Sequence, residues 1–339
     1  MKFPESDIYK LKQLLASRKK IVIVTHRNPD GDALGSSLGF KFFLEKKNQE
    51  VDFVSPTAYT QNLSWIQGTK DILVNEGEAG KKLCEAKIKA ADIIFCLDFN
   101  ALSRLENLGE IIKSAPAEKV MIDHHQQPED FASLVFSNVS YCSTAEMVYD
   151  IIADLDEENL VDEKTAECLY VGLATDNGFF QFSNTTANAL QVASALVARG
   201  ARPEYVSEKV NNIFRETRLR FFGYCLHEKL KLVKNGSVAY MMITQAEIKK
   251  FYLQGGDSEG LVNYAFKIDG VKVSAYFSEE PDRIKISFRS RGDIDVNTFA
   301  RTFFEGGGHK NAAGGKSMIN LEMTEKKFLE ALESLNLKS

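Results

Sequence analysis

The first 125 residues alternate between short apolar runs and longer stretches with the apolar spacing of helices. The short runs are rich in β-branched residues, and each ends at polar residues. This alternation predicts βαβ units and therefore an α/β domain with a mainly parallel sheet flanked by helices, whose ligand site lies at the carboxyl ends of the strands. We expect strands at residues 21–25, 51–55, 92–98 and 119–123, and helices near 33–47, 79–90 and 104–113.

From residue 144 to about 234 the pattern becomes mostly helical, and a turn signal at 234–237 ends this block. The remaining pattern of short strands and helices predicts a second, smaller α+β domain. Thr244 and Glu247 form a capping-box pattern, and Asp269-Gly270 is typical of a hairpin turn. Expected strands are 237–244, 262–268, 271–277 and 283–290, with helices near 295–304 and 324–335 and a glycine-rich loop at 305–315.

Composition narrows the class of protein without identifying a function. The chain has 339 residues, 44% hydrophobic and 26% charged, which is typical of a globular protein with two domains. The N-terminus has no signal-peptide pattern and no apolar stretch reaches 18 residues, so we expect a cytoplasmic protein without a membrane partner. Five cysteines without paired spacing argue against a disulfide framework and a structural zinc site. A net charge of −5 disfavours a long nucleic-acid track and leaves a small anionic substrate open.

A histidine and two aspartates directly follow the first expected strand. His26, Asp30 and Asp32 are spaced four and two residues apart, and Gly31 lets the loop between them fold tightly. The three side chains can therefore converge on one cation. The same residues are also compatible with an ordinary turn at 29–31 and with Asp32 as a helix N-cap.

Further polar positions end other apolar elements. Asp98 ends the run IIFCLD, and Asp123-His124-His125 ends the run KVMID. Neighbouring strand residues point to opposite faces, so the two histidines can share a ligand only where the strand has ended. Asp176 stands where a helical run breaks, a position that electrostatically disfavours an acid unless a counter-charge such as a metal ion is present. Taken singly, each position is also compatible with a solvated strand end, a cap or a satisfied polar histidine.

Together these residues form a mixed set of carboxylates and imidazoles without a thiolate. Such a set suits Mn²⁺, Mg²⁺, Fe²⁺ or Co²⁺ better than a structural zinc ion. The number of oxygen donors exceeds the needs of one ion, and two ions bridged by a carboxylate and a water form the usual two-metal hydrolytic arrangement.

The glycine-rich segment near residue 306 is a candidate anion site. Backbone N–H groups of Gly306, Gly307 and Gly308 can approach an anion closely, and His309 adds a donor. Arg289, on the preceding strand, has a planar fork that suits phosphate. A flexible connector and a surface arginine are the alternatives.

The order of these motifs resembles the DHH/DHHA1 phosphoesterase superfamily. Within it, the resemblance is specifically to the subgroup of nanoRNase/pAp phosphatases, also termed bifunctional oligoribonuclease and PAP phosphatase or exopolyphosphatase-related proteins. The motifs cover nearly the whole chain: H-x-N-P-D-G-D-A-x-G-S, a strand ending in D, D-H-H, T-D-x-G-x-F, R-S and G-G-G-H-x-x-A-A-G. The resemblance implies a DHH catalytic metal-binding domain at 1–213, a helical linker at 214–236 and a DHHA1 substrate-binding domain at 237–339.

The resemblance also implies a role for each motif residue. Two divalent ions, with Mn²⁺ favoured over Mg²⁺ or Co²⁺, would be held by His26 and Asp30 on one side, by Asp32, His124 and Asp176 on the other, and by Asp98 between them. The catalytic group would comprise Asp98, Asp123 as an orienting carboxylate, and His125 as a phosphate ligand or general acid. The residues that bind the phosphates of the substrate would be Arg289, Gly306, Gly307, Gly308 and His309.

The function implied by the resemblance is hydrolysis of very short RNA to mononucleotides and of 3'-phosphoadenosine 5'-phosphate (pAp) to AMP. Rival substrates are cyclic dinucleotides, the linear dinucleotide pApA, pyrophosphate or polyphosphate, and long single strands. A nucleotide-binding module without turnover is disfavoured, because it needs neither two metals nor His125. The expected partners are short RNA oligonucleotides and small nucleotides, and the sequence is compatible with a homodimer.

Overall fold

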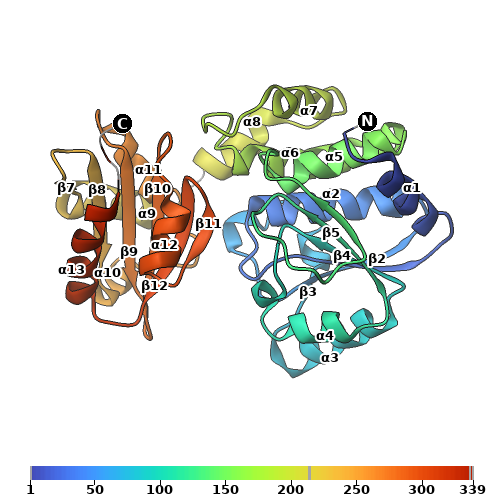
Figure 1. Ribbon diagram of the computed structural model, residues 1–339, viewed down its shortest axis with the longest axis horizontal. Coiled ribbons are helices and arrows are strands. Elements are labelled where there is room, and N and C mark those ends of the chain that lie inside the picture. Colours follow the sequence, from blue (N-terminus) through green and yellow to red (C-terminus); the bar gives the residue numbers. More distant parts are fainter. Residues whose placement is uncertain (1, 213–214, 336, 338–339) are drawn as a thin grey trace. The chain divides into compact units, whose positions relative to one another are not determined.

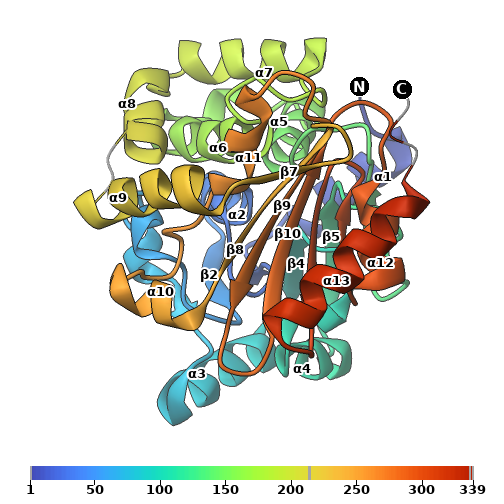
Figure 2. The same cartoon turned by 90° about the vertical axis from the view of Figure 1, so that its left-hand side faces the viewer.

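The computed structural model describes residues 2–212, 215–335 and 337. Contacts divide the chain into two compact units, Met1–Ile213 and Phe214–Ser339, termed here the first and second units. Within the described residues each unit carries one six-stranded sheet (Figures 1 and 2). None of the helices in this described part has both the length and the apolar character that a membrane crossing requires.

The first unit is an α/β structure whose described strands are all parallel, in the order β3-β2-β1-β4-β5-β6. Its strands are β1 (Lys20–Val24), β2 (Glu50–Ser55), β3 (Leu73–Val74), β4 (Ile93–Leu97), β5 (Glu118–Asp123) and β6 (Leu134–Ser137). Its helices are α1 (Glu5–Leu14), α2 (Gly31–Lys46), α3 (Gly77–Ala90), α4 (Leu108–Ser114), α5 (Thr144–Asp154), α6 (Glu163–Asp176), α7 (Ala187–Ala198) and α8 (Pro203–Ser207).

Helices cover both faces of the first sheet. In Figure 1, α2, α5 and α6 lie on one side of the strands and α3 and α4 on the other. The alternate side chains of β1 and β4 divide between the two layers: Ile23 and Phe95 join the core beneath α2, whereas Val24 and Cys96 join the core beneath α3 and α4. Burial on both faces explains why the strands are continuous apolar runs rather than alternating ones.

The strands expected in the first unit are confirmed as β1, β2, β4 and β5, and the fold class is confirmed with them. The short edge strands β3 and β6 were not predicted. β3 has only two residues and β6 leaves Val135 exposed, so neither has the buried apolar run that identified the central strands.

The second unit packs helices against a mixed sheet of order β11-β12-β10-β9-β8-β7, in which only the β8 and β9 pair of the described strands is parallel. Its strands are β7 (Lys231–Val233), β8 (Val238–Ile243), β9 (Val273–Glu279), β10 (Ile284–Ser290), β11 (Gly307–His309) and β12 (Ala312–Ser317). Its helices are α9 (Glu216–Tyr224), α10 (Gln245–Lys250), α11 (Leu261–Tyr264), α12 (Val296–Phe303) and α13 (Leu321–Ala331).

Two expectations for the second unit were wrong. The segment 262–268 was predicted as a strand but forms α11 and a 3-10 turn, because its buried residues Leu261, Val262 and Ala265 have helical spacing. The turn at Asp269-Gly270 therefore joins a helical segment to β9 and closes no hairpin. By contrast, the capping box of Thr244 and Glu247 is confirmed at the start of α10.

The glycine-rich segment is also more regular than predicted. Instead of a loop it forms the edge strand β11 and its neighbour β12, and the register pairs Gly307 with Gly314 and His309 with Ala312. Residues 216–229, within the expected helical linker, are helical as α9 and a π-helical turn, and the chain continues directly into β7 of the second sheet.

A stripe of glycines brings α2 unusually close to α6. Gly31, Gly35 and Gly39 recur every four residues and therefore share one face of α2. A Cβ atom on Gly35 would lie 2.5 Å from the carbonyl oxygen of Cys168 and 2.5 Å from the amide nitrogen of Gly172. Both neighbours are backbone atoms of α6, so a side chain at position 35 could be accommodated only if the two helices moved apart.

We predict that Gly35→Ala destabilises the first unit by about 1–3 kcal/mol, because the added methyl forces the two helices apart. Urea unfolding should be followed by circular dichroism and by the emission of Trp65, the single tryptophan of the chain. Gly223→Ala in α9 is the matched control, since a Cβ there meets nothing within 4 Å. An unchanged urea midpoint for Gly35→Ala would contradict the close helix contact.

Candidate metal centre

The candidate site lies at the carboxyl edge of the first sheet, where the strand order reverses. The chain runs from β1 outward to β2 and then returns to the other side of β1 as β4, and such a switch point is where open α/β sheets bind ligands. His26 follows β1, Asp98 follows β4, and Asp123 ends β5 with His124 and His125 behind it.

Asp98 lies between two imidazoles. Its Oδ2 is 3.4 Å from Nε2 of His26, and its Oδ1 is 3.6 Å from Nε2 of His124. On the first side, Asp30 Oδ2 is 3.9 Å from the same His26 nitrogen. The two oxygens of one carboxylate therefore face two separate groups of donors.

The second group gathers around His124. Its Nε2 lies 3.8 Å from Asp32 Oδ2 and 3.4 Å from Asp176 Oδ2. Asp176 is the last residue of α6, as the break in the helical pattern indicated. The structure thus brings together all six side chains that the sequence nominated as metal ligands.

Backbone carbonyls fix the orientation of both imidazoles. Nδ1 of His26 lies 2.8 Å from the carbonyl oxygen of Arg27, and Nδ1 of His124 lies 3.3 Å from that of Tyr141. A carbonyl can only accept, so each Nδ1 carries a hydrogen and each Nε2 is turned toward the carboxylates, to which it donates when protonated and where its lone pair would serve a metal ion once that proton is lost. This is the arrangement by which metal-binding histidines are usually oriented.

Asp32 is anchored by the N-terminus of α5. Its Oδ2 accepts from the amide of Thr144 at 2.6 Å, and its Oδ1 accepts from the amide of Ala145 at 3.0 Å. The first helical amides and the helix dipole favour a negative charge at this point. The alternative reading of Asp32 as an N-cap is wrong: Asp30 caps α2 by accepting from the amides of residues 32 and 33.

Asp98 is also held from two directions. Its amide donates to the carbonyl of Ile122 at 3.1 Å, with Asp98 itself in the left-handed region at φ 65°. The Thr144 hydroxyl donates to its Oδ1 at 2.9 Å. Thr144 therefore connects Asp32 and Asp98, a role that no sequence motif indicated.

Burial and crowding set the protonation of the cluster. Burial alone would raise the pKa of Asp98, but the hydrogen bond from His26 and the neighbouring imidazoles hold that pKa well below its usual range. Burial, followed by the charge of Asp98, raises the pKa of Asp32 well above its ordinary value. Burial lowers the pKa of His26 and of His124, yet the nearby carboxylates outweigh it and raise both. The cluster therefore retains protons that a metal ion must displace.

His125 belongs to a different arrangement from His124. Its Nδ1 lies 2.7 Å from Asp123 Oδ1, and its amide donates to Asp123 Oδ2 at 3.1 Å. Asp123 is fully buried, so it can orient its neighbour but does not itself face solvent. The neighbouring histidines thus point their rings at different partners. Arg104, which belongs to none of the sequence motifs, also contacts this histidine: its Nη1 lies 3.0 Å from Nε2 of His125.

The phosphate-binding candidates Arg289 and His309 of the second unit lie on strands near one end of its strand order. Arg289 on β10 and His309 on β11 are both paired with Ala312 of the intervening strand β12. Residues directly opposite one another in antiparallel strands project to the same face, so the two side chains stand on one face. Gly308 adopts φ 148°, and its Cβ would lie 2.5 Å from the carbonyl oxygen of Ala312, so the hairpin itself requires glycine there.

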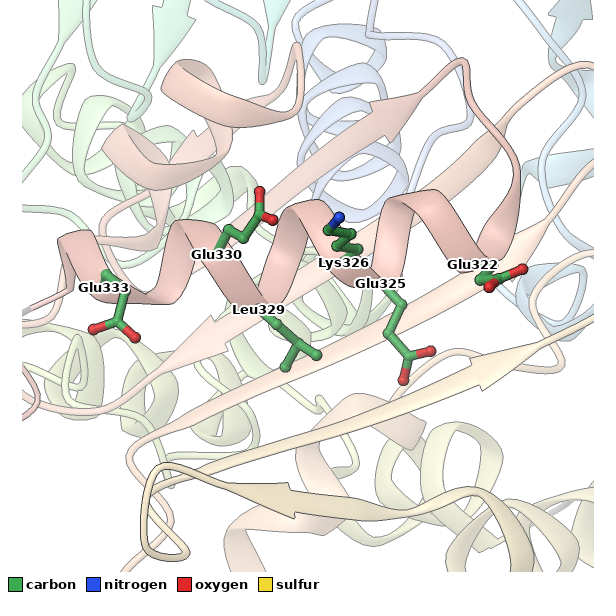
Figure 3. A pocket seen from close by; sticks show the side chains of 6 residues that line it. All are labelled: Glu322, Glu325, Lys326, Leu329, Glu330 and Glu333. Carbon is green, nitrogen blue, oxygen red and sulfur yellow. The ribbon is translucent and has the colours of Figure 1, made fainter.

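A hollow of about 530 Å³ beside α13 is not a candidate for an anionic substrate. Figure 3 shows the glutamate side chains that α13 and the 3-10 turn after it present around this hollow. Its lining residues are Glu322, Glu325, Lys326, Leu329, Glu330 and Glu333. Four carboxylates against one ammonium would repel phosphate.

The donor set of the first unit fits divalent cations. Ligands about 2.1 Å from an ion and at right angles to one another lie about 3 Å apart, close to the 3.4–3.9 Å separations between donor atoms here. Groups of three donors within 4.8 Å of one another meet at His26, Asp30 and Asp98 and again at Asp32, Asp98 and His124. Carboxylate oxygen with imidazole nitrogen is the chemistry of Mg²⁺, Mn²⁺ and related ions.

Two protein families match the chain: residues 20–173 match the DHH family, N-terminal domain, and residues 235–336 match the DHHA1 domain. The chain is 28% identical over 298 residues to the bifunctional oligoribonuclease and PAP phosphatase NrnA of Bacillus subtilis, covering 87% of this chain and 88% of that protein. It is 30% identical to the protein of the same name from Mycoplasma genitalium, covering 87% of each. A solved structure of an exopolyphosphatase-related protein from Bacteroides fragilis superposes with a TM-score of 0.93, at 37% identity, over 98% of this chain and 96% of that one.

We predict that Asp176→Asn stabilises the metal-free protein but weakens its response to metal. Removing a negative charge from the C-terminal end of α6 should contribute roughly 0.3–1 kcal/mol to the metal-free first unit. Melting temperatures with a chelator should rise, whereas the further rise on adding Mn²⁺ should shrink. Asp156→Asn is the control, because Asp156 lies in an exposed turn at φ 60° that asparagine tolerates. An unchanged gain with Mn²⁺ would remove Asp176 from the ligand set.

The raised pKa values of His26, His124 and Asp32 predict that Mn²⁺ binding releases protons. A raised pKa means that more of each group is protonated near neutral pH, so apparent affinity should fall as pH falls from 8 to 6. Titration calorimetry in two buffers of different ionisation enthalpy measures the released protons at each pH. Equal binding enthalpies in both buffers would contradict this electrostatic account.

Proposed function

Because the chain belongs to the DHH family of metal-dependent phosphoesterases and carries a DHHA1 domain, we propose that it hydrolyses very short oligoribonucleotides to mononucleotides and pAp to AMP. The observation that carries this proposal is Asp98, whose two carboxylate oxygens face two different imidazoles. Such a carboxylate is suited to bridging two cations. We assign Mn²⁺ as the preferred ion, with Mg²⁺ or Co²⁺ as substitutes.

Two bound cations would supply the field that acidifies a water molecule and neutralises the phosphoryl oxygens. His26 and Asp30 would hold one ion and Asp32, His124 and Asp176 the other. Thr144 and the α5 N-terminus keep Asp98 and Asp32 in place for that task. Preorganised ligands of this kind pay little reorganisation cost when the reaction occurs.

Asp123 and His125 would serve the substrate rather than the ions. The buried carboxylate of Asp123 accepts from His125 and fixes the direction of its ring. The resemblance assigns this pair to the neighbourhood of the scissile phosphate. Arg289 and His309 would bind further phosphate groups. The absence of side chains at Gly306, Gly307 and Gly308 would let this segment pack closely against β12 beside that phosphate site.

The substrate class follows from charge as well as from similarity. The net charge of −5 offers no field for a long polyanion, whereas two or three local cationic groups suffice for pAp or a dinucleotide. Both relatives named NrnA are described as acting on oligoribonucleotides and PAP. A cytoplasmic location and the oligomeric state remain predictions from the sequence.

We predict that the purified protein with Mn²⁺ cleaves pAp and pApA faster than cyclic di-AMP, pyrophosphate or a long single-stranded RNA. Initial rates at equal concentrations of the five substrates, followed by chromatography of the products, measure this order. The preference reflects phosphate groups held locally rather than along a basic track. Fastest cleavage of pyrophosphate or the long RNA would overturn the proposed function.

Asp98→Ala and His124→Ala should each reduce this turnover by roughly 1,000-fold or more, since each removes several kcal/mol of charge stabilisation. His227→Ala is the matched control, because His227 is 85% exposed and lies outside every motif. Circular dichroism should show the fold intact in all three variants. Mn²⁺-dependent turnover retained in Asp98→Ala would exclude the bridging role.

A further inference from the structure

Arg104 stands beside the metal cluster on a firmly held loop. It lies in the 3-10 helix η3 (Leu102–Leu105), which follows β4. Its carbonyl accepts from the amide of Arg27 at 2.9 Å, and the amide of Leu102 donates to the carboxylate of Glu129 at 2.9 Å. The loops that follow β1, β4 and β5 are therefore tied together around this arginine.

The contact between Arg104 and His125 defines where the imidazole hydrogen resides. Nη1 of Arg104 lies 3.0 Å from Nε2 of His125, and a guanidinium can only donate. Nε2 must then be the acceptor, so the hydrogen of the neutral ring is on Nδ1, which donates to Asp123 Oδ1 at 2.7 Å. Arg104, His125 and Asp123 thus form one directed chain of hydrogen bonds.

The remaining donors of Arg104 have no carboxylate to satisfy them. Among the residues that the structure describes, no acidic side chain lies within ion-pair distance of this guanidinium. Its positive charge nevertheless acts on the cluster, because it lowers the pKa of His26, whereas the nearby carboxylates raise that pKa. The side chain is only partly buried. A partly exposed guanidinium with unused N–H groups is suited to an incoming phosphate oxygen.

We propose that Arg104 positions His125 and binds the scissile phosphate: one N–H holds Nε2 of His125, and the others meet a phosphate oxygen. This role rests on the phosphoesterase function proposed above. His125 then acts in this arrangement as a hydrogen-bond acceptor, and the group that donates to the phosphate is the guanidinium. The general-acid role for His125 is thereby replaced by electrostatic stabilisation from Arg104.

Nitrogen NMR tests the contact without relying on activity. Long-range nitrogen–proton spectra of histidine-labelled, Mg²⁺-loaded protein distinguish protonated from unprotonated ring nitrogens, and His125→Asn assigns the signal among five histidines. We expect His125 to carry hydrogen on Nδ1 and a bare Nε2, and we expect Arg104→Ala to shift the Nε2 resonance while those of His26 and His124 persist. A protonated Nε2 in the wild type, or an unchanged resonance in the variant, would overturn the positioning role.

Kinetics test the phosphate contact. Arg104→Ala should lower kcat/KM for pAp about 10- to 100-fold, as for loss of a charge-assisted hydrogen bond, and added guanidinium ion should restore part of it. Arg104→Lys should stay impaired because lysine lacks the fork. The control is Arg18→Ala, which removes an equally positive but exposed side chain just before β1, at the amino-terminal ends of the strands. Its kcat/KM should stay within twofold of wild type. Arg104→Ala within twofold of wild type would overturn the proposal.

If the wild type cleaves neither pAp nor pApA, the proposed function is wrong, while the Nε2 resonance still decides the contact with His125. A titration with inorganic phosphate then decides anion binding: weaker binding by Arg104→Ala than by Arg18→Ala supports it, and equal binding contradicts it.

Discussion

Mutual repulsion among buried carboxylates is the constraint on which the first unit depends. Asp32 and Asp98 are almost completely buried and close to Asp176, and charges taken out of water repel strongly unless cations or dipoles are near. Each local feature of the site supplies such compensation. The imidazoles of His26 and His124 face the carboxylates, and the α5 N-terminus donates two amides to Asp32. A pair of divalent ions would complete what these partial charges begin.

The same constraint explains the close packing behind the site. Asp30 caps the N-terminus of α2 and Asp32 lies in its first turn, whereas Asp176 is the last residue of α6. The carboxylates of the two helices can contribute to one metal centre only if the helices pack closely together. Glycines on α2 make that approach sterically possible. The glycine pattern of α2 is therefore a steric condition for the proposed metal centre. Packing and function cannot be separated in this pair of helices.

The adjacent histidines His124 and His125 point in different directions because different partners hold their rings. A hydrogen bond to a backbone carbonyl orients His124 so that its Nε2 lies beside the carboxylates. In His125, Nδ1 contacts Asp123 and Nε2 contacts Arg104. The strand has just ended at Asp123, so the backbone is no longer obliged to alternate its side chains across a sheet. One turn thereby presents one imidazole to the buried carboxylates and the other to Arg104.

The sequence by itself determined the fold class, the central strands and the six candidate ligands, because buried parallel strands are continuous apolar runs and their polar ends are conspicuous. It misjudged segment 262–268, where a short apolar run fits a strand or a helix equally well, and the glycine segment, where close strand pairing requires glycine as much as a loop does. Only the tertiary structure decided that Asp30 caps α2 while Asp32 binds the α5 N-terminus, and that Thr144 and Arg104 belong to the site. Apart from the local cap at Asp30, these contacts join residues between 21 and 112 positions apart, and no local pattern of apolar and polar residues encodes which distant donors will meet.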